Sequence, residues 1–240
     1  MNPPTAQQIV ETILQAQRTI HLDEFGNPAN WGLDTDTLVE LGKVLRPGWV
    51  TAETGAGGST ILCSAVGRRH FVVCPDPAEI VRIRKVLADH ALPDHLVPLV
   101  QSSDVALPGL ASMLGGELLD LALIDGAHRY PFPILDWHYF APPLRVDGWM
   151  LVDDIQIPSV GVLLDYLKQD DDWRLEKVTG KTAWFRKLRD EVIVDEWTGQ
   201  TINRNLASGD DAIPTLGKLR EQIALKFKHA IGRRVKKFRS

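Results

Sequence analysis

The sequence predicts an α/β fold: a doubly wound, seven-stranded sheet that is mostly parallel, with one antiparallel strand near the C-terminal end. Three observations predict it. Five short apolar runs alternate with segments of helix length, as in a parallel sheet whose strands are joined by helices. The runs are almost continuously apolar, which suits strands that helices cover on both faces. Two further strand-like stretches, joined through a glycine, follow the last predicted helix.

Two helices are expected before the first strand. The first spans about residues 5–20, where aliphatic side chains recur at helical spacing and Thr5 with Gln8 forms a capping box. The second begins near Asp34, carries a leucine stripe, and ends at the Pro-Gly breaker of residues 47–48.

The predicted strands follow in order. The five apolar runs are WVTAE at 49–53, HFVVC at 70–74, HLVPLV at 95–100, LDLALID at 119–125 and WMLVDD at 149–154. A helix is expected around residues 160–168, and the stretches at 173–180 and 181–188 then form a hairpin through Gly180. The hairpin reverses one strand and completes a Rossmann-like sheet of seven strands.

The length of 240 residues and a hydrophobic content of 44% allow one full core with extensions at both ends. We expect a helical extension over 1–33, a main domain over 34–188, and a polar linker with a basic amphipathic helix over 189–240. The formal net charge of −4 argues against a nucleic-acid partner, because proteins that bind the phosphate backbone carry an excess of Lys and Arg.

Cysteine usage and the first residues of the chain bear on the compartment. Cys63 and Cys74 both lie in apolar stretches, which supports neither a disulfide framework nor a thiolate zinc site. The first residues lack the basic and apolar regions of a signal peptide, and no run of about twenty apolar residues occurs. We therefore expect a cytoplasmic protein without a transmembrane segment.

The motif ETGAGGST, residues 53–60, lies directly after the first predicted strand and before a helical segment. Its glycines permit a tight strand-to-helix turn and let a ligand approach the backbone, while Ser59 or Thr60 can cap the helix. Turns of this kind also bind nucleotide phosphates, and some merely close a loop. The motif alone therefore indicates a ligand site without naming the ligand.

Two carboxylates near this motif narrow the choice of ligand. Glu53, at the strand end, would repel a pyrophosphate but can accept hydrogen bonds from the ammonium group of a methionine moiety, directly or through water. Asp76 follows the next strand, about twenty residues beyond the glycines, where a carboxylate can bind both ribose hydroxyls of an adenosine. A nicotinamide enzyme would place an acid there too, and Asp76 is equally suited to cap the following helix.

With VVCPDP, LIDGAHRY and LRVDGWMLVDDI following in order, the chain resembles the class I SAM-dependent methyltransferases. More narrowly it resembles the methyltransferase-24 group, in which IDG-x-H-x-Y follows the fourth strand and VDD ends the fifth. The resemblance covers about residues 34–188, and the terminal hairpin is also typical of this class. The glycine loop departs from the E-x-G-x-G-x-G pattern, because Ser59 stands at the third glycine position.

This resemblance implies S-adenosylmethionine (SAM) as the cofactor and residues 34–188 as the SAM-binding domain. Glu53, Gly55 and Gly57 would contact the methionine part, Asp76 the ribose, and Ser103 or Asp104 the adenine edge. The full set of implied cofactor-binding residues is Glu53, Gly55, Gly57, Ser59, Asp76, Ser103, Asp104 and Asp125. Ser and Asp after a strand are also ordinary turn residues, so the adenine assignment rests on position alone.

A second group of polar residues is Asp125, His128, Asp153 and Asp154, expected at the carboxyl ends of neighbouring strands. Three nearby carboxylates repel one another, so such a cluster needs a metal or basic groups. Metal-dependent O-methyltransferases, including those that act on sugars, look similar here, which implies Mg²⁺ at Asp125, Asp153 and Asp154. The alternative is that Asp153 and Asp154 cap a loop and line the cofactor pocket.

His128 and Asp125 are the candidate catalytic residues. A neutral imidazole can take the proton of an acceptor hydroxyl during methyl transfer, and a bound metal would lower the pKa of that hydroxyl. A lone histidine in a loop is often structural, so a packing role for His128 is the competing interpretation.

The predicted function is SAM-dependent O-methylation of a small molecule such as a sugar or secondary metabolite, with Mg²⁺ assistance as an option. One alternative is a nicotinamide-dependent oxidoreductase, which would leave Glu53 and the terminal hairpin unexplained. Another is a non-catalytic module that keeps the pocket and binds a partner or membrane through its basic tail.

The last segment, residues 216–240, has an apolar stripe surrounded by Lys and Arg. Such a helix can touch an anionic membrane surface or an anionic substrate, or pack on the domain or on a second subunit of a homodimer. Packing is the interpretation that composition favours.

Overall fold

The computed structural model describes residues 4–190, except 24 and 30, together with residues 200–203. The chain divides into two compact units, Met1–Ile193 and Val194–Ser240. Of the second unit, the structure describes only the short helix η3 (Thr201–Asn203) and the residue before it, so the predicted basic helix lies outside the described residues. Within the described residues, no helix combines the length and apolar character needed to cross a membrane.

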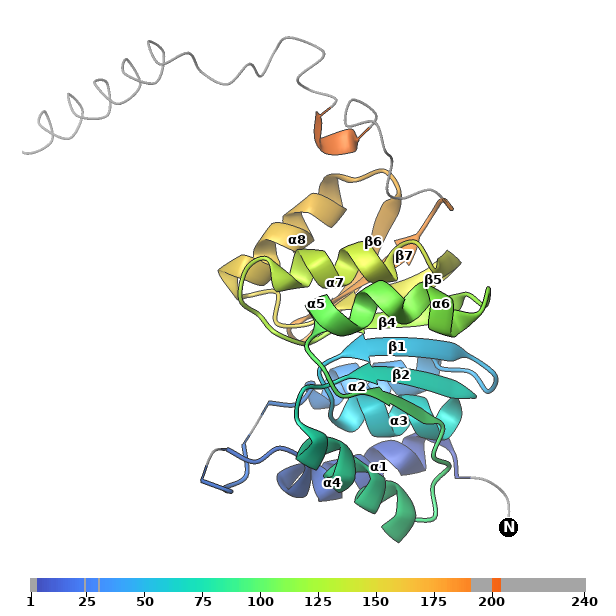
Figure 1. Ribbon diagram of the computed structural model, residues 1–240, viewed down its shortest axis with the longest axis vertical. Helices are drawn as coiled ribbons and strands as arrows, with labels where there is room; N and C mark the ends of the chain where they lie inside the picture. The colour runs from blue at the N-terminus through green and yellow to red at the C-terminus, as the bar shows by residue number, and fades with distance from the viewer. Residues whose placement is uncertain (1–3, 24, 30, 191–199, 204–240) are drawn as a thin grey trace, which may run out of the picture. The chain divides into compact units, whose positions relative to one another are not determined.

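The first unit is built on a seven-stranded sheet of order β3-β2-β1-β4-β5-β7-β6 (Figure 1). The strands are β1 (Val50–Thr54), β2 (Arg69–Val73), β3 (Leu96–Leu99), β4 (Leu119–Ile124), β5 (Leu144–Val152), β6 (Trp173–Thr179) and β7 (Thr182–Lys187). Strand β7 runs antiparallel to both of its neighbours, whereas the pairs among β1 to β5 are parallel. The predicted fold class, including the reversed strand near the C-terminal end, is confirmed.

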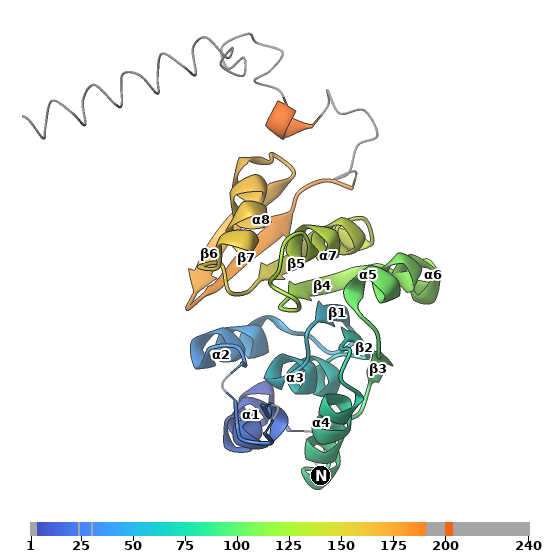
Figure 2. The same cartoon turned by 60° about the vertical axis from the view of Figure 1, so that its left-hand side comes forward.

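Helices cover both faces of the sheet, as the apolar strands require. One face carries α1 (Ala6–Ile20), α2 (Thr35–Val44), α3 (Gly58–Val66) and α4 (Pro77–Asp89). The other carries α5 (Ser103–Ala106), η1 (Leu107–Gly109), α6 (Leu110–Leu114), α7 (Phe132–Phe140) and α8 (Pro158–Gln169). Figure 2 shows the two groups of helices on opposite sides of the strands. The buried apolar residues accordingly form two clusters, one on each face.

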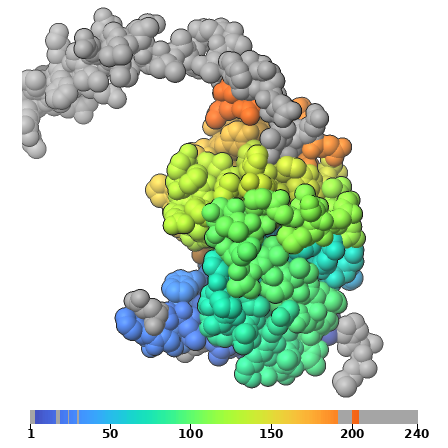
Figure 3. Space-filling model, in the orientation of Figure 1, coloured from blue at the N-terminus to red at the C-terminus, as the bar shows by residue number. Residues whose placement is uncertain are grey.

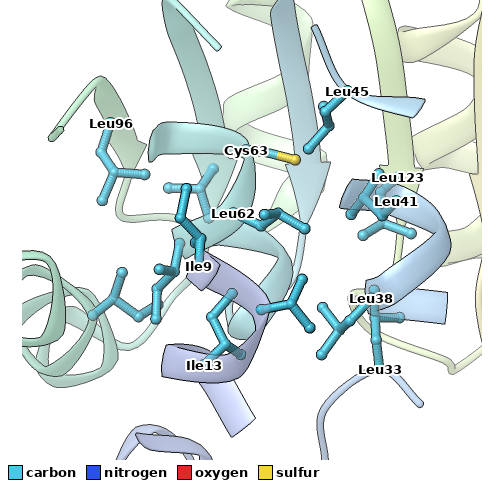
Figure 4. Packing of buried hydrophobic residues seen from close by; sticks show 14 of the residues in the cluster. Ile9, Ile13, Leu33, Leu38, Leu41, Leu45, Leu62, Cys63, Leu96 and Leu123 are labelled. Atoms are coloured by element: carbon cyan, nitrogen blue, oxygen red, sulfur yellow. The ribbon is translucent and has the colours of Figure 1, made fainter. Parts of the chain in front are cut away.

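The N-terminal helix α1 is part of the packed core. Thr5 and Gln8 form the predicted capping box, and Ile9 and Ile13 are buried against α3. Figure 4 shows these isoleucines in the cluster that α2, α3 and the sheet share. A side chain at Gly58 would come within 2.7 Å of Ile13, so this glycine lets α1 approach α3 closely. As a result, the chain that leaves α1 runs beside the edge of the sheet where the strands end.

Candidate active site

A cavity of about 710 Å³ opens at the carboxyl ends of the parallel strands. Its walls come from the carboxyl ends of β1 and β2, from the segments that follow β1 to β5, from the turn before β7, and from the N-terminal segment around His21 and Trp31. Ligands of open α/β sheets bind at this edge, and the volume suits a small molecule or cofactor.

The loop between β1 and α3 forms the floor of the cavity near β4. Gly55 lines the cavity and has a φ of +82°, and a side chain there would stand 2.2 Å from the carbonyl oxygen of Asp125. Gly57 precedes the first residue of α3, and a side chain there would come within 2.8 Å of His21 Nε2. Both glycines are thus required by close approaches, one to β4 and one to the N-terminal segment.

Glu53 lies in the interior beneath this loop, with 1% of its surface exposed. It accepts a hydrogen bond from the Thr60 hydroxyl and lies 3.1 Å from His70 Nε2. The Thr60 hydroxyl in turn accepts from the Gly57 amide at 2.8 Å. Glu53 therefore holds the glycine loop from below and is not among the residues that line the cavity. Its predicted contact with a methionine ammonium group stays a prediction.

The other predicted cofactor residues divide into those that line the cavity and those that do not. Ser103, at the start of α5, lines it, whereas Asp104 does not. Ser59 is buried in the first turn of α3. Asp76 caps α4 by accepting from the Ala78 amide at 2.9 Å and pairs with Arg82 at 3.3 Å. The carboxylate that reaches the cavity from α4 is instead Glu79, which sequence reasoning missed.

At the β4–β5 end of the cavity, Asp125, His128 and Asp154 converge. One ligand atom from each lies within 4.8 Å of the others, an arrangement that could hold a metal ion. His128 Nε2 is 3.3 Å from Asp154 and 3.7 Å from Asp125. Burial raises the pKa of Asp125 to about 7, and the neighbouring Asp125 carboxylate raises the pKa of His128 although burial opposes this. Asp125 can therefore exchange a proton near neutral pH, and His128 holds its proton more tightly than a free histidine does.

Lys181 supplies positive charge to this cluster and was not among the predicted site residues. Its Nζ lies 2.8 Å from Asp154 and 3.3 Å from Asp153. Burial opposes the charged ammonium, but the two carboxylates outweigh burial and raise the pKa of Lys181. Asp153 itself is fully buried and accepts from the Thr182 hydroxyl, so it faces β7 and not the cavity. Its predicted role as a metal ligand stays a prediction.

Comparison with known proteins decides the class of the domain. Residues 52–155, which span the glycine loop and the acidic cluster, match the family model Methyltransf_24, described as a methyltransferase domain. The chain contains a class I, SAM-dependent methyltransferase domain. No curated protein sequence matches the chain.

Solved structures share the fold of this methyltransferase at low sequence identity. The O-methyltransferase TomG from Streptomyces achromogenes, involved in tomaymycin synthesis and solved with SAM, is 15% identical over 75% of this chain and 90% of its own, with a TM-score of 0.58. Cofactor-bound Rv0187 from MTB is 16% identical over 78% of this chain and 98% of its own, with a TM-score of 0.55. An rRNA methylase from Streptococcus thermophilus is 12% identical over 66% of this chain and 99% of its own, with a TM-score of 0.50. These similarities show the fold and leave the methyl acceptor open.

A buried carboxyl beneath the cavity makes the stability of the methyltransferase depend on pH. Asp136 is fully buried and accepts from the Thr54 hydroxyl at 2.8 Å; burial raises its pKa from 3.8 to about 6, although Ser103 and Thr54 oppose this. The folded state holds the proton of the Asp136 carboxyl more tightly than the unfolded chain does. The stability that this protonated carboxyl contributes is therefore fully present below pH ~4 and is lost as pH rises towards ~6. Relative to Asp136→Asn, we expect the free energy of unfolding to fall by up to about 3 kcal/mol over this range. Urea unfolding of both proteins across the range measures this difference, and a constant difference would contradict the prediction.

Proposed function

We propose that this methyltransferase transfers the methyl group of SAM to an oxygen atom of a small molecule, such as a sugar or a secondary metabolite. The observation that carries the proposal is the continuity of one cavity from the glycine loop to the cluster of Asp125, His128 and Asp154. A cofactor on the loop and an acceptor beside the cluster would meet inside this cavity. Methyl transfer needs little more than this alignment and removal of one proton.

The cofactor would lie across the ends of β1 to β4. Backbone groups around Gly55 would hold its methionine part, Glu53 would act by holding the glycine loop from below, and Ser103 would meet the adenine edge. The SAM-bound structure that shares the fold supports this cofactor. The sulfonium methyl would then face the β4–β5 end of the cavity.

The acceptor hydroxyl would lie beside His128, which is partly exposed to the cavity. The hydroxyl oxygen attacks the methyl carbon, the carbon–sulfur bond breaks, and the hydroxyl proton passes to the imidazole. Asp125 and Asp154 stabilise the imidazolium because both carboxylates lie within 4 Å of the ring nitrogen. Asp125 is the group to which the proton can move next, since its pKa lies near 7.

A divalent cation is the second candidate for activating the acceptor. Asp125, Asp154 and His128 fit a metal by the proximity of their ligand atoms, and Asp153 is the fourth residue that the sequence assigns. Such an ion, when bound, would lower the pKa of an acceptor hydroxyl. Against it, the Lys181 ammonium already places positive charge beside the Asp153 and Asp154 carboxylates. Charge balance thus favours catalysis without the metal.

Turnover in the presence of a chelator tests this choice. We expect S-adenosylhomocysteine (SAH) formation with hydroxylated acceptors to persist in EDTA and to change less than about twofold on adding Mg²⁺. The assay uses a library of sugars and phenols, with Asp154→Asn and Asp153→Asn as matched variants. Loss of turnover in EDTA, restored by Mg²⁺ in the wild type and weakened in Asp154→Asn, would assign the cluster to a metal. Methyl transfer to ribosomal RNA alone would overturn the small-molecule proposal.

A further inference from the structure

His21, the residue that follows α1, lines the same cavity although it lies outside the segment that matches the methyltransferase family. Its backbone is held on both sides. Arg82 Nε donates to the carbonyl oxygen of Ile20 at 2.7 Å, and the amide of Ala29 donates to the carbonyl oxygen of His21 at 2.9 Å. Figure 3 shows the blue N-terminal residues lying against the segments that follow them in the chain. The position of the ring is thus fixed by the fold.

The imidazole is oriented by Glu79. His21 Nδ1 lies 2.7 Å from one carboxylate oxygen of Glu79, and the Cys74 thiol donates to the other at 3.2 Å. Because a carboxylate can only accept a hydrogen bond, Nδ1 is the donor to Glu79, which leaves Nε2 to face the glycine loop as the second ring nitrogen. This nitrogen points to the glycine loop, since a side chain at Gly57 would stand 2.8 Å from it.

His21 Nε2 is buried and has no hydrogen-bond partner among the described residues, while the residue is 4% exposed. An unpaired buried nitrogen costs free energy, and native structures pair such groups with protein, water or ligand. The residue lines the cavity, and its Nε2 lies beside Gly57 of the glycine loop, where the proposed cofactor would bind. A ligand hydroxyl that donates to Nε2 would remove the cost.

The position of His21 along the sheet indicates which part of the cofactor would contact Nε2. His21 and Glu79 lie where β2 ends and α4 begins, beside the glycine loop. In nucleotide-binding α/β folds, an acid in this region, about twenty residues beyond the glycines, binds ribose hydroxyls. Asp76 is turned towards Arg82 and the first turn of α4, whereas Glu79 lines the cavity.

We propose that His21 is a cofactor-binding residue whose Nε2 accepts a hydrogen bond from a ribose hydroxyl of SAM, with Glu79 holding the ring. The inference rests on the proposed cofactor, and it assigns part of the nucleoside site to the N-terminal segment. Trp31 belongs to the same segment and also lines the cavity. The centroid of its ring lies 6.5 Å from that of the His21 ring. The methyltransferase domain is then incomplete without the residues that precede its sheet.

Calorimetric binding of two nucleosides tests the assignment without an activity measurement. SAH carries the ribose and the amino-acid end, whereas methylthioadenosine carries only the ribose and base. We expect His21→Ala to weaken both by the same factor, about tenfold, because one hydrogen bond to the shared ribose is lost. His21→Gln, which keeps an acceptor, should recover part of the affinity, and His90→Ala, at the exposed end of α4, should bind as the wild type does.

A ligand lacking one ribose hydroxyl sharpens the test. For the 2′-deoxy or the 3′-deoxy form of methylthioadenosine, His21→Ala should cause no further loss, because the partner of Nε2 is already absent. Additive losses for both deoxy ligands, unchanged binding in His21→Ala, or a loss confined to SAH would each overturn the proposal. Comparing Glu79→Gln with Asp76→Asn shows which of the two carboxylates supports ribose binding. A loss of methylthioadenosine affinity only in Asp76→Asn would overturn the role of Glu79.

Two controls distinguish the loss of this hydrogen bond from a folding defect and from the absence of cofactor binding. If His21→Ala lowers the melting temperature of the free protein, Gly57→Ala displaces the ring without removing it and should weaken methylthioadenosine to a similar extent. Failure of the proposed cofactor has a different signature, because the wild type would then bind neither nucleoside. Wild-type binding without turnover of any hydroxylated acceptor would overturn the proposed reaction and leave the role of His21 standing.

Discussion

Replacing His128 by alanine should lower the rate of methyl transfer by about 10²- to 10³-fold while SAH binding changes less than about threefold. The imidazole would take the acceptor proton, and its interaction with Asp125 and Asp154 makes it a stronger base than a free histidine. Because the ring lies at the acceptor end of the cavity, its removal should leave the cofactor's contacts in place. Single-turnover rates and calorimetry on the same preparation measure both quantities.

The pH profile distinguishes a base from a residue that only shapes the pocket. A base must be neutral to act, and the pKa of His128 is raised, so kcat/KM in EDTA should rise with pH through a midpoint above the usual histidine value of about 6.5. Removing the charge of Asp154 in Asp154→Asn should move that midpoint to lower pH. His138→Ala, on the exposed side of α7, is the matched control. An unchanged profile in Asp154→Asn, or full activity in His128→Ala, would contradict the assignment.

The strands were predictable because their signal is local. Continuous apolar runs bounded by turns locate β1 to β4, and the strand-like stretches joined through Gly180 locate the β6–β7 hairpin, all to within about two residues. The start of β5 was predicted at residue 149 but lies at Leu144. Asp147-Gly148 looks like a turn in the sequence, and Asp147 indeed has a φ of +59°, yet the strand continues through a shift in its register against β4.

The acidic cluster was predictable for a topological reason, and its internal arrangement was not. Parallel strands end at one edge of the sheet, so residues after β4 and β5 had to meet there. Beyond the end of β5 the backbone leaves the extended conformation at Asp154, which has a φ of +55°; Asp153 contacts Thr182 in the interior, whereas Asp154 lines the cavity. Glu53 and Thr54, both within β1, divide between the interior and the cavity because successive residues of a strand point to opposite sides.

Two residues that line the cavity, Lys181 and His21, come from segments whose position depends on tertiary packing. Lys181 immediately precedes the reversed strand β7, and the prediction that this strand reverses could have placed it at the same edge as Asp154. His21 reaches the cavity only because α1 packs on α3, which depends on the small residue Gly58. No local sequence motif predicts such a contact.

Gly55→Ala should destabilise the protein by about 3 to 5 kcal/mol and abolish measurable SAH binding. Two costs combine at this residue. A φ of +82° disfavours any side chain by about 1–2 kcal/mol, and the new carbon would stand 2.2 Å from the carbonyl oxygen of Asp125. The contact can be relieved only by moving the end of β4 away from the loop, which displaces Asp125 and opens the cavity between donor and acceptor.

Gly116→Ala separates the two costs. Gly116 has a φ of +89° and nothing within 4 Å of the position that a side chain would take, so it carries the dihedral cost alone. It follows α6, in a segment that does not line the cavity. We expect about 1–2 kcal/mol of destabilisation there and unchanged SAH binding. Urea unfolding and calorimetry on both variants compare them, and equal losses of stability with SAH binding retained in Gly55→Ala would show that the close approach of the loop to β4 does not form the site.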